Sequence, residues 1–597
     1  MILTSPIISS EESFTRITLE DATSTLRVTG EPMMPKITKT FILPLGTQVT
    51  DTIVQESSDN TQYLQAKVLP SAEPVIDGAV IPNERTLKAS IYETNALYPS
   101  QPYTTHQTVG LHEGEHVIFH TVHYYPIRYN PVENVIIYSN EVDIQIEYLL
   151  PTDDTSIQTT DNQDLLVIYP ELFSEEIQPF IDHKNDFNMN TYGKTLEDIY
   201  AEQTQGVDDQ EKIKLAIKDA IETEGISYVL LVGGHKGQSD NWYVPVRYGH
   251  SPSEDAYASD LYYSDIYKIV DTQPVFDDWD SNDNGKFAEY GGFIKDVIDG
   301  APDVYIGRLA CRSEKEVTTV VNKIITYEET KAAESWFKHM LLIGGDTYPY
   351  DGNYDGCEAE IDTDLSASYM DGFTFTRLWA STGLLTGQSV VEDAINDGAG
   401  LIHMAGHANP SCLVTHPPHS EETITILQMY DIGDPLNMNP KLDNKDMLPV
   451  ILIGGCHNSQ FNVSLMNIIK GIMEYGIKGM FLESPYKFYY MEWVPKCFSW
   501  WLTSNPNGGA IATMGNTGLG MGIGGQDYVT GLDGWLFPRF FYHYGQDGQE
   551  FIGMAHSSAI TDYVNEFDIN SDGEDRQMIQ QWALLGDPSL MIGGYDN

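Results

Sequence analysis

Two residues of this sequence could act together as a nucleophile and its general base. His407 follows the apolar run LIHMAG, and Cys456 follows the apolar run PVILIGG. A free thiol, with a pKa of about 8.5, is mostly protonated at neutral pH, so an imidazole that takes its proton activates it. Gly455 would let a substrate backbone approach, and N–H groups at Cys456 and after His407 could stabilise an oxyanion. The pair predicts acyl transfer, although alone a Cys and a His at strand ends are more often structural.

The elements around these two residues alternate between strands and helices. Nearly continuous apolar runs are separated by helical patterns from residue 164 onward, which predicts an α/β fold: a doubly wound, mostly parallel sheet with helices on both faces. Sheets of this type bind and convert substrates at the carboxyl ends of their strands, where His407 and Cys456 are expected. The predicted strands include 164–170, 226–234, 302–310, 339–346, 374–380, 400–407, 448–456, 478–484 and 509–516.

Residues 1–150 differ from the rest of the chain. Segments such as HVIFHTVHYYPIRY and EVDIQIEYLL carry β-branched and aromatic residues between Pro, Gly, Asn and Asp. This pattern predicts an N-terminal all-β sandwich domain. The polar stretch 151–163 is expected to be a linker, followed by a first α/β subdomain over 164–338 and a catalytic subdomain over 339–597.

The composition excludes several classes of protein. The 597 residues include 33 Lys and Arg against 87 Asp and Glu, a formal net charge of −54, which disfavours nucleic acid and anionic lipid as partners. Five Cys in so long a chain do not indicate a disulfide framework. No apolar run is long enough to span a membrane, and no export signal is visible at the start. The oligomeric state does not follow from the sequence.

Two acidic segments have the spacing of a calcium-binding loop. Oxygen ligands at alternate positions, a Gly at the sharp turn and a late carboxylate are what such a loop requires. The second segment lacks that late carboxylate, and an Asx-rich turn is the alternative for both. The predicted calcium ligands are Asp280, Asn282, Asn284 and Glu289 in the first segment, and Asp568, Asn570 and Asp572 in the second.

Two other motif matches are expected to have no chemical role. HEGEH at 112–116 fits a zinc-peptidase motif, but Gly114 and the strand-like residues after it favour a hairpin turn at Glu113-Gly114-Glu115. The glycines of 520–525 fit a dinucleotide-binding spacing, but no helical pattern opens on them. A flexible loop that borders a pocket is the better interpretation.

The order of these segments resembles the gingipain family, within the caspase-like clan of cysteine peptidases. An apolar strand that ends in Gly-His is followed 49 residues later by one that ends in a small residue and Cys. SYVLLVGGHKG, PDVYIGRLACRSEKE, CHNSQF and LLGDPSLMI are similar to landmarks of that family, over about residues 164–595. The N-terminal strands are similar to its β-rich pro-domain. The resemblance implies a caspase-like fold and a calcium-assisted endopeptidase, made as a zymogen and secreted or exposed at the cell surface.

The resemblance also implies roles for individual residues. Cys456 matches the nucleophile and His407 the general base and acid. Asp346 falls near the acid that supports this His, and Glu360 aligns with the acid at the base of the S1 pocket in Arg-directed members, so cleavage after Arg or Lys is expected. Ala408 stands where the family has Gly, and it would be strained if that position required a positive φ.

These features leave two functional hypotheses. The first is a cysteine endopeptidase acting on a peptide or protein substrate, which the presence of both Cys456 and His407 favours. The second is a catalytically silent surface or scaffold protein that keeps the peptidase fold and binds partners through its acidic face, which Ala408 favours. Because 151–163 contains no Lys or Arg, self-cleavage there after a basic residue is not expected.

Overall fold

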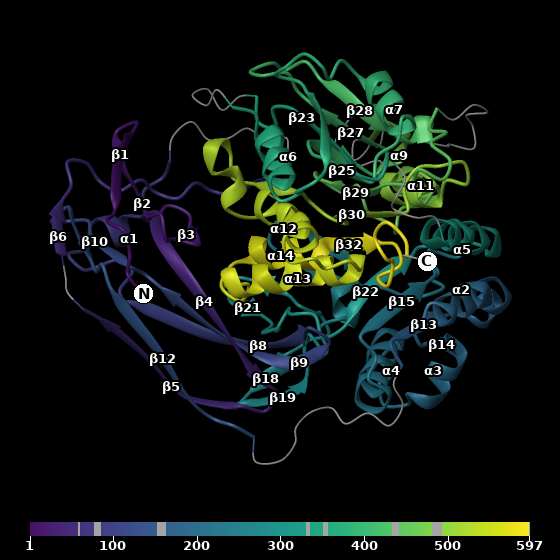
Figure 1. The fold of residues 1–597 in the computed structure, drawn as a ribbon, viewed down its shortest axis with the longest axis horizontal. Coiled ribbons are helices and arrows are strands. Elements are labelled where there is room, and N and C mark those ends of the chain that lie inside the picture. Colours follow the sequence, from purple (N-terminus) through teal and green to yellow (C-terminus); the bar gives the residue numbers. More distant parts are fainter. Residues whose placement is uncertain are drawn as a thin grey trace.

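The computed structural model describes most of the chain in three strand-containing parts (Figure 1). An N-terminal strand-rich region precedes two α/β sheets whose helices cover both faces, which confirms the predicted fold class. The predicted linker lies largely outside the described residues, so the domain boundaries stay predictions. The described residues are 1–57, 60–76, 85–151, 163–329, 335–349, 356–432, 441–479 and 492–595.

The N-terminal region is built from antiparallel strands around a core of its own. The buried side chains of Met34, Tyr124 and Ile127 belong to this core. A two-residue turn with positive φ at Glu113 and Gly114 joins two long strands, which confirms the hairpin expected at HEGEH. The main sheet has the order β3-β4-β9-β8, with β3 at Ser24–Leu26, β4 at Met34–Pro44, β9 at Glu115–Tyr124 and β8 at Tyr103–His112. Smaller sheets pair β1 (Ile7–Glu11) with β2 (Phe14–Thr18), β5 (Gln48–Glu56) with β12 (Val142–Leu149), and β11 (Val135–Tyr138) with both β6 (Asn60–Tyr63) and β10 (Ile127–Asn130).

The first α/β sheet contains four parallel strands. Helix α4 beside it begins where the Asp208 side chain accepts the Glu211 N–H and ends at Gly225, which has a left-handed conformation. Helices α2 and α5 pack against each other. The strand order is β14 (Thr191–Thr195), β13 (Leu165–Tyr169), β15 (Tyr228–Val232), β22 (Tyr305–Leu309). The helices are α2 (Ser174–Asp186), α3 (Leu196–Glu202), α4 (Asp209–Glu224) and α5 (Glu314–Glu329).

The second sheet contains six strands, and only its last strand, β32, is antiparallel to its neighbour. A small antiparallel sheet, β26-β27-β28, extends from the end of β25. The predicted strand at 478–484 lies mostly outside the described residues. The main order is β24 (Thr374–Trp379), β23 (His339–Gly344), β25 (Leu401–Met404), β29 (Val450–Ile453), β30 (Ala512–Asn516), β32 (Trp582–Leu585). The small sheet contains β26 (His407–Asn409), β27 (Cys412–Thr415) and β28 (Ile424–Gln428).

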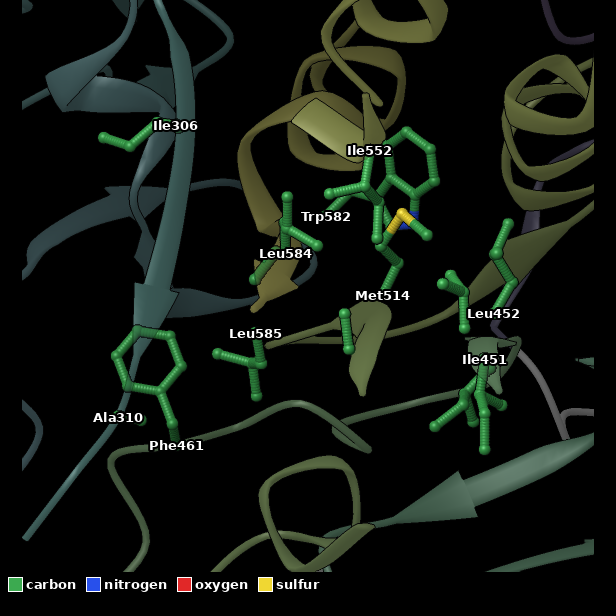
Figure 2. Close-up of a cluster of buried hydrophobic side chains, with 14 of the residues drawn as sticks. Ile306, Ala310, Ile451, Leu452, Phe461, Met514, Ile552, Trp582, Leu584 and Leu585 are labelled. Atoms are coloured by element: carbon green, nitrogen blue, oxygen red, sulfur yellow. The ribbon is translucent and has the colours of Figure 1, made fainter. Parts of the chain in front are cut away.

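One hydrophobic core joins the two α/β sheets. Figure 2 shows Leu584 and Leu585 of β32 between Ile306 of β22 and Met514 of β30. Gly307 permits this contact, because a Cβ at that position would lie 2.5 Å from the Gly586 carbonyl oxygen. The two sheets are therefore held as one packed body.

The C-terminal helices lie between the N-terminal strands and the second sheet (Figure 1). Helix α12 packs on α6 and α13, and α13 also contacts strands of the N-terminal sheet. Among the helices that the structure describes, none is long and apolar enough to cross a bilayer. The helices are α6 (Glu358–Ser368), α12 (Asp533–Gly545), α13 (Ile552–Glu566) and α14 (Gly573–Gln581).

Candidate active site

His407 and Cys456 occupy equivalent positions after neighbouring parallel strands. Met404 pairs with Ile453 in the register of β25 and β29, and each candidate residue comes three positions later. The following loops touch at Gly455, where an added Cβ would lie 2.4 Å from the Gly406 carbonyl oxygen. The structure thus brings the predicted pair to one edge of the sheet.

A compact turn holds Cys456. The side-chain amide of Asn458 donates to the carbonyls of Ile453 (3.1 Å) and Gly455 (2.7 Å), so the chain folds back directly after β29. His457 has a φ of 54°, an uncommon backbone conformation for a non-glycine residue that often marks a functional site. The thiol lies 3.7 Å from the Gly520 carbonyl oxygen. The glycine-rich loop after β30 therefore borders the candidate nucleophile.

His407 is a half-buried imidazole whose two ring nitrogens are shielded from solvent. Its ring lies 5.4 Å from the ring of His416, edge to face, and neither of its nitrogens has a hydrogen-bond partner among the described residues. The pKa of His407 is lowered to about 4, mainly by burial and also by the charge of His416, while a contact with the Thr347 backbone opposes the shift. His407 is therefore unprotonated at neutral pH, as a general base must be.

Asp346 lies near this pair but binds other partners. Its carboxylate accepts the backbone N–H groups of Tyr348 (3.1 Å) and His419 (2.8 Å). No hydrogen bond joins it to His407 in the described part of the chain. Burial raises the pKa of Asp346. These contacts hold the loop after β23 in its conformation. A hydrogen bond or charge interaction by which Asp346 supports His407 stays a prediction.

Ala408 does not have the strained backbone that its position could have required. It pairs with Leu413 in the β26–β27 ladder, and its φ is not positive. An alanine therefore fits without distortion. The oxyanion-binding roles of Ala408, Gly455 and the Cys456 backbone stay predictions.

Two carboxylates of α6 differ in what they contact. Glu360 accepts hydrogen bonds from the backbone and hydroxyl of Ser381, after the edge strand β24. Glu358 is completely buried and accepts the N–H groups of Thr347 (3.2 Å) and Gly525 (2.9 Å). These two groups belong to the loops that border His407 and Cys456. Glu358, which the sequence interpretation did not select, is thus the carboxylate of this pair that contacts the loops of the site.

The first predicted calcium loop is closed by its own hydrogen bonds. Asp280 accepts the N–H groups of Asn284 (2.9 Å) and Gly285 (2.8 Å). Glu289 accepts the Asn284 amide, and the Lys286 ammonium lies 3.2 Å from it. Asn282 uses its backbone N–H to contact Asp296. The contacts have the form of the alternative, an Asx-rich turn.

The predicted ligands of the second loop also form hydrogen bonds with other groups of this chain. Asp568 accepts the Asn570 N–H and the Ser571 hydroxyl, and the Asn570 amide oxygen accepts from Arg576. Asp572 caps the start of α14. Across the described residues, no group of three or more His, Cys, Asp or Glu is arranged to hold a metal ion. In this structure the predicted ligands of both loops bond to protein groups, and calcium binding at either loop stays a prediction.

A mostly parallel sheet that presents a Cys and a His on neighbouring strand ends is the arrangement expected of a caspase-like cysteine peptidase. The profile of Peptidase family C25 matches residues 158–593, and the profile Propeptide_C25 matches residues 4–167. The chain therefore belongs to peptidase family C25, the family of the gingipains, and carries its propeptide region.

Individual relatives are distant. Gingipain R2 of Porphyromonas gingivalis is 23% identical over 446 residues, which cover 73% of this chain and 47% of the relative. Gingipain R1 of the same species is 21% identical over 537 residues, covering 84% and 44%. The crystal structure of gingipain R (RgpB) aligns with a TM-score of 0.46 and 18% identity over 73% of this chain and 79% of that one. The chain spans about half the length of the curated relatives it matches.

Proposed function

We propose that this chain is a cysteine endopeptidase, with Cys456 as nucleophile and His407 as general base and acid. The observation that carries the proposal is the pair of equivalent strand ends, which places a thiol and a neutral imidazole at one edge of the sheet. His407 takes the Cys456 proton, and the thiolate attacks the peptide carbonyl carbon. The protonated imidazole then gives its proton to the leaving amine, and water hydrolyses the thioester.

The competing hypothesis of a silent scaffold loses its main support, because Ala408 is unstrained. A thiol-directed peptidyl probe tests the choice. We expect label on Cys456 in the parent and a large loss of label in His407→Ala. Label that is absent, or equal in both proteins, would favour the scaffold. The resemblance supports an exported protein, either secreted or on the cell surface, that acts on peptide or protein substrates.

We further propose that the enzyme cleaves after Arg or Lys. A buried carboxylate at the base of S1 would pair with the basic side chain. Glu360 is the residue that the resemblance selects, whereas Glu358 is the one that contacts the loops beside His407 and Cys456.

We also propose that the N-terminal region keeps the enzyme latent. Its strand β7 (Val75–Ile76) pairs with β31 (Met521–Gly522), directly after the Gly520 carbonyl that contacts the Cys456 thiol. A strand in this place would compete with a substrate backbone for the edge of the site.

Ion pairs fasten the N-terminal region to the rest of the chain. Arg16 makes two hydrogen bonds of 2.9 Å to Asp527, and Arg85 lies 3.3 Å from the same carboxylate. Only 4% of the Asp527 side chain is exposed. Further pairs are Arg27 with Asp575 (2.9 Å) and Lys36 with Glu566 (3.2 Å).

Replacing Asp527 with Asn is expected to loosen the N-terminal region and to raise basal peptide cleavage. Removal of one member of a buried pair costs about 3–5 kcal/mol, because the remaining charge is left uncompensated. The measurement is hydrolysis of a fluorogenic peptide by the full chain. Glu31→Gln is the control, since it breaks a pair with Lys88 inside the N-terminal region. Equal basal rates for Asp527→Asn and the parent, with probe-reactive Cys456 in both, would exclude this anchor.

Calcium remains a proposal that a stability measurement can test. If the loops at 280–289 and 568–572 bind calcium in solution, excess calcium should raise the thermal midpoint above its value in chelator, because a ligand that binds only the folded state stabilises it. Asp280→Asn should remove the contribution of the first loop and Asp568→Asn that of the second, so the two changes together should abolish the difference. Identical midpoints in calcium and in chelator would leave the loops as Asx-rich turns.

A further inference from the structure

The most informative feature beyond the proposed pair is the partner of His407. The nearest predicted acid, Asp346, is bonded to backbone N–H groups of its own loop region. The ring that contacts His407 is the imidazole of His416. We infer that His416 is a positioning residue that orients His407 by edge-to-face packing, in place of a carboxylate. This inference deepens the proposed peptidase function and rests on it.

The backbone of His416 is fixed from two sides. His416 directly follows β27, the strand that pairs with β26 and its His407. Its carbonyl accepts the Asp346 N–H at 3.0 Å. Gly345 makes this approach possible, because a Cβ there would lie 2.5 Å from the His416 carbonyl oxygen. The end of β23 and the hairpin after β25 therefore hold the residue between them.

The ring of His416 is fixed as well. Its Nδ1 lies 3.1 Å from the Glu422 carbonyl oxygen. Since a carbonyl only accepts, Nδ1 carries the proton, and in the neutral ring Nε2 is the unprotonated nitrogen. One hydrogen bond thus sets both the tautomer and the plane of the ring that His407 meets.

Packing is what orients His407 here. The two ring centroids are 5.4 Å apart with an interplanar angle of 64°, within the range of favourable edge-to-face pairs. Neither His407 nitrogen has a partner with good hydrogen-bond geometry within the described residues, although the Thr347 backbone lies close enough to act on its pKa, so ring packing contributes to the orientation of the imidazole. An imidazole partner brings no negative charge to stabilise the imidazolium, and the positive charge that His416 can carry lowers the pKa of His407, so His407 stays a free base at lower pH than it would beside a carboxylate.

The charged and titratable groups around the pair come from four places. The loop after β23 contributes Asp346, and α6 contributes Glu358, which bonds the Thr347 N–H. The hairpin carries His419, whose backbone N–H bonds Asp346, and the turn after β29 carries Cys456. A pH effect of His416 must be separated from these groups by substitution.

Two substitutions of His416 separate packing from charge. His416→Phe keeps an aromatic edge and removes the titrating group, whereas His416→Ala removes the ring. We expect His416→Ala to lower kcat about 10- to 100-fold with KM nearly unchanged, because a misplaced base loses reactive geometry but not substrate binding. His416→Phe should keep kcat within about threefold of the parent, and its acid limb should move to higher pH. His112→Phe, in the N-terminal hairpin, is the control.

A second readout does not depend on turnover. In full-length protein with Cys456→Ala, labelled with ¹³C at histidine Cε1, the His407 resonance is assigned by its loss in His407→Gln. We expect its titration to move to higher pH in both His416 variants, and its line to broaden in His416→Ala only.

The outcomes distinguish the two proposals. Altered titration and line width without peptide cleavage in the parent would refute the peptidase and retain the positioning role. Parental titration, line width and kcat in His416→Ala would overturn the positioning role and leave the peptidase intact. A kcat loss in His416→Phe equal to that in His416→Ala would also overturn it, because an aromatic edge would then not be sufficient.

Discussion

Cys456→Ala is expected to abolish peptide cleavage while the fold remains intact. Loss of the sulfur removes the covalent route, and such losses lower kcat by about a thousandfold or more. The side chain is nearly buried, and the turn around it is held by Asn458 rather than by the thiol, so the substitution should disturb little. The measurement is hydrolysis of a fluorogenic peptide, with circular dichroism as the check on folding.

The other cysteines provide matched controls. Cys311 and Cys497 are completely buried, and burial raises the pKa of both thiols, so neither is prepared to act as a thiolate. Cys311→Ala and Cys497→Ala should lose some stability through small cavities and retain cleavage. Cleavage by Cys456→Ala at the parental rate would refute the mechanism.

The fold could be predicted because its signals are local. Continuous apolar runs indicated buried parallel strands, and the two strands that end near His407 and Cys456 are adjacent in the observed sheet. The hairpin at HEGEH followed from Gly114. The direction of β32, the last strand of the sheet, could not be predicted. It runs antiparallel to β30, and strand direction depends on the path of the helices before it.

The site was less predictable than the fold, because its contacts are set by loops. The interaction of His407 with His416 depends on the return of the chain after β27 to the end of β23. No rule about residue spacing predicts this return of the chain from the sequence. The short distance in sequence between the two histidines, with Asn409 and Pro410 between them, was the available signal.

The choice between Glu358 and Glu360 illustrates a second limit. Residues two positions apart on a helix point in directions about 200° apart, so a misalignment of two positions exchanges a site residue for one on another face. At identities of 18–23% such errors are not resolved by sequence. The buried contacts of α6 supply the missing information, since Glu358 reaches the loops at Thr347 and Gly525 and Glu360 reaches Ser381.

Glu358→Gln is expected to remove most of the preference for Arg or Lys before the scissile bond. A guanidinium can pair with a carboxylate through two parallel hydrogen bonds, and the pair is strong where water is excluded. Loss of one partner costs about 2–5 kcal/mol, or roughly thirty- to several-thousand-fold in kcat/KM. Glu360→Gln, whose carboxylate bonds Ser381, should change the preference only a few-fold.

A peptide library with all residues at the position before the scissile bond, applied to the parent and both variants, measures this preference. Glu358 also holds two backbone N–H groups, so its loss could disturb the loops as well as the pocket. Two checks separate these effects: Glu358→Asp, which keeps the charge, and cleavage of an apolar peptide, which needs no acid. Selective loss on basic peptides in Glu358→Gln assigns the pocket to Glu358. The same loss in Glu360→Gln alone would instead assign the pocket to Glu360. A parent enzyme that prefers apolar or acidic residues would exclude both glutamates from the pocket, because a buried carboxylate cannot favour such side chains.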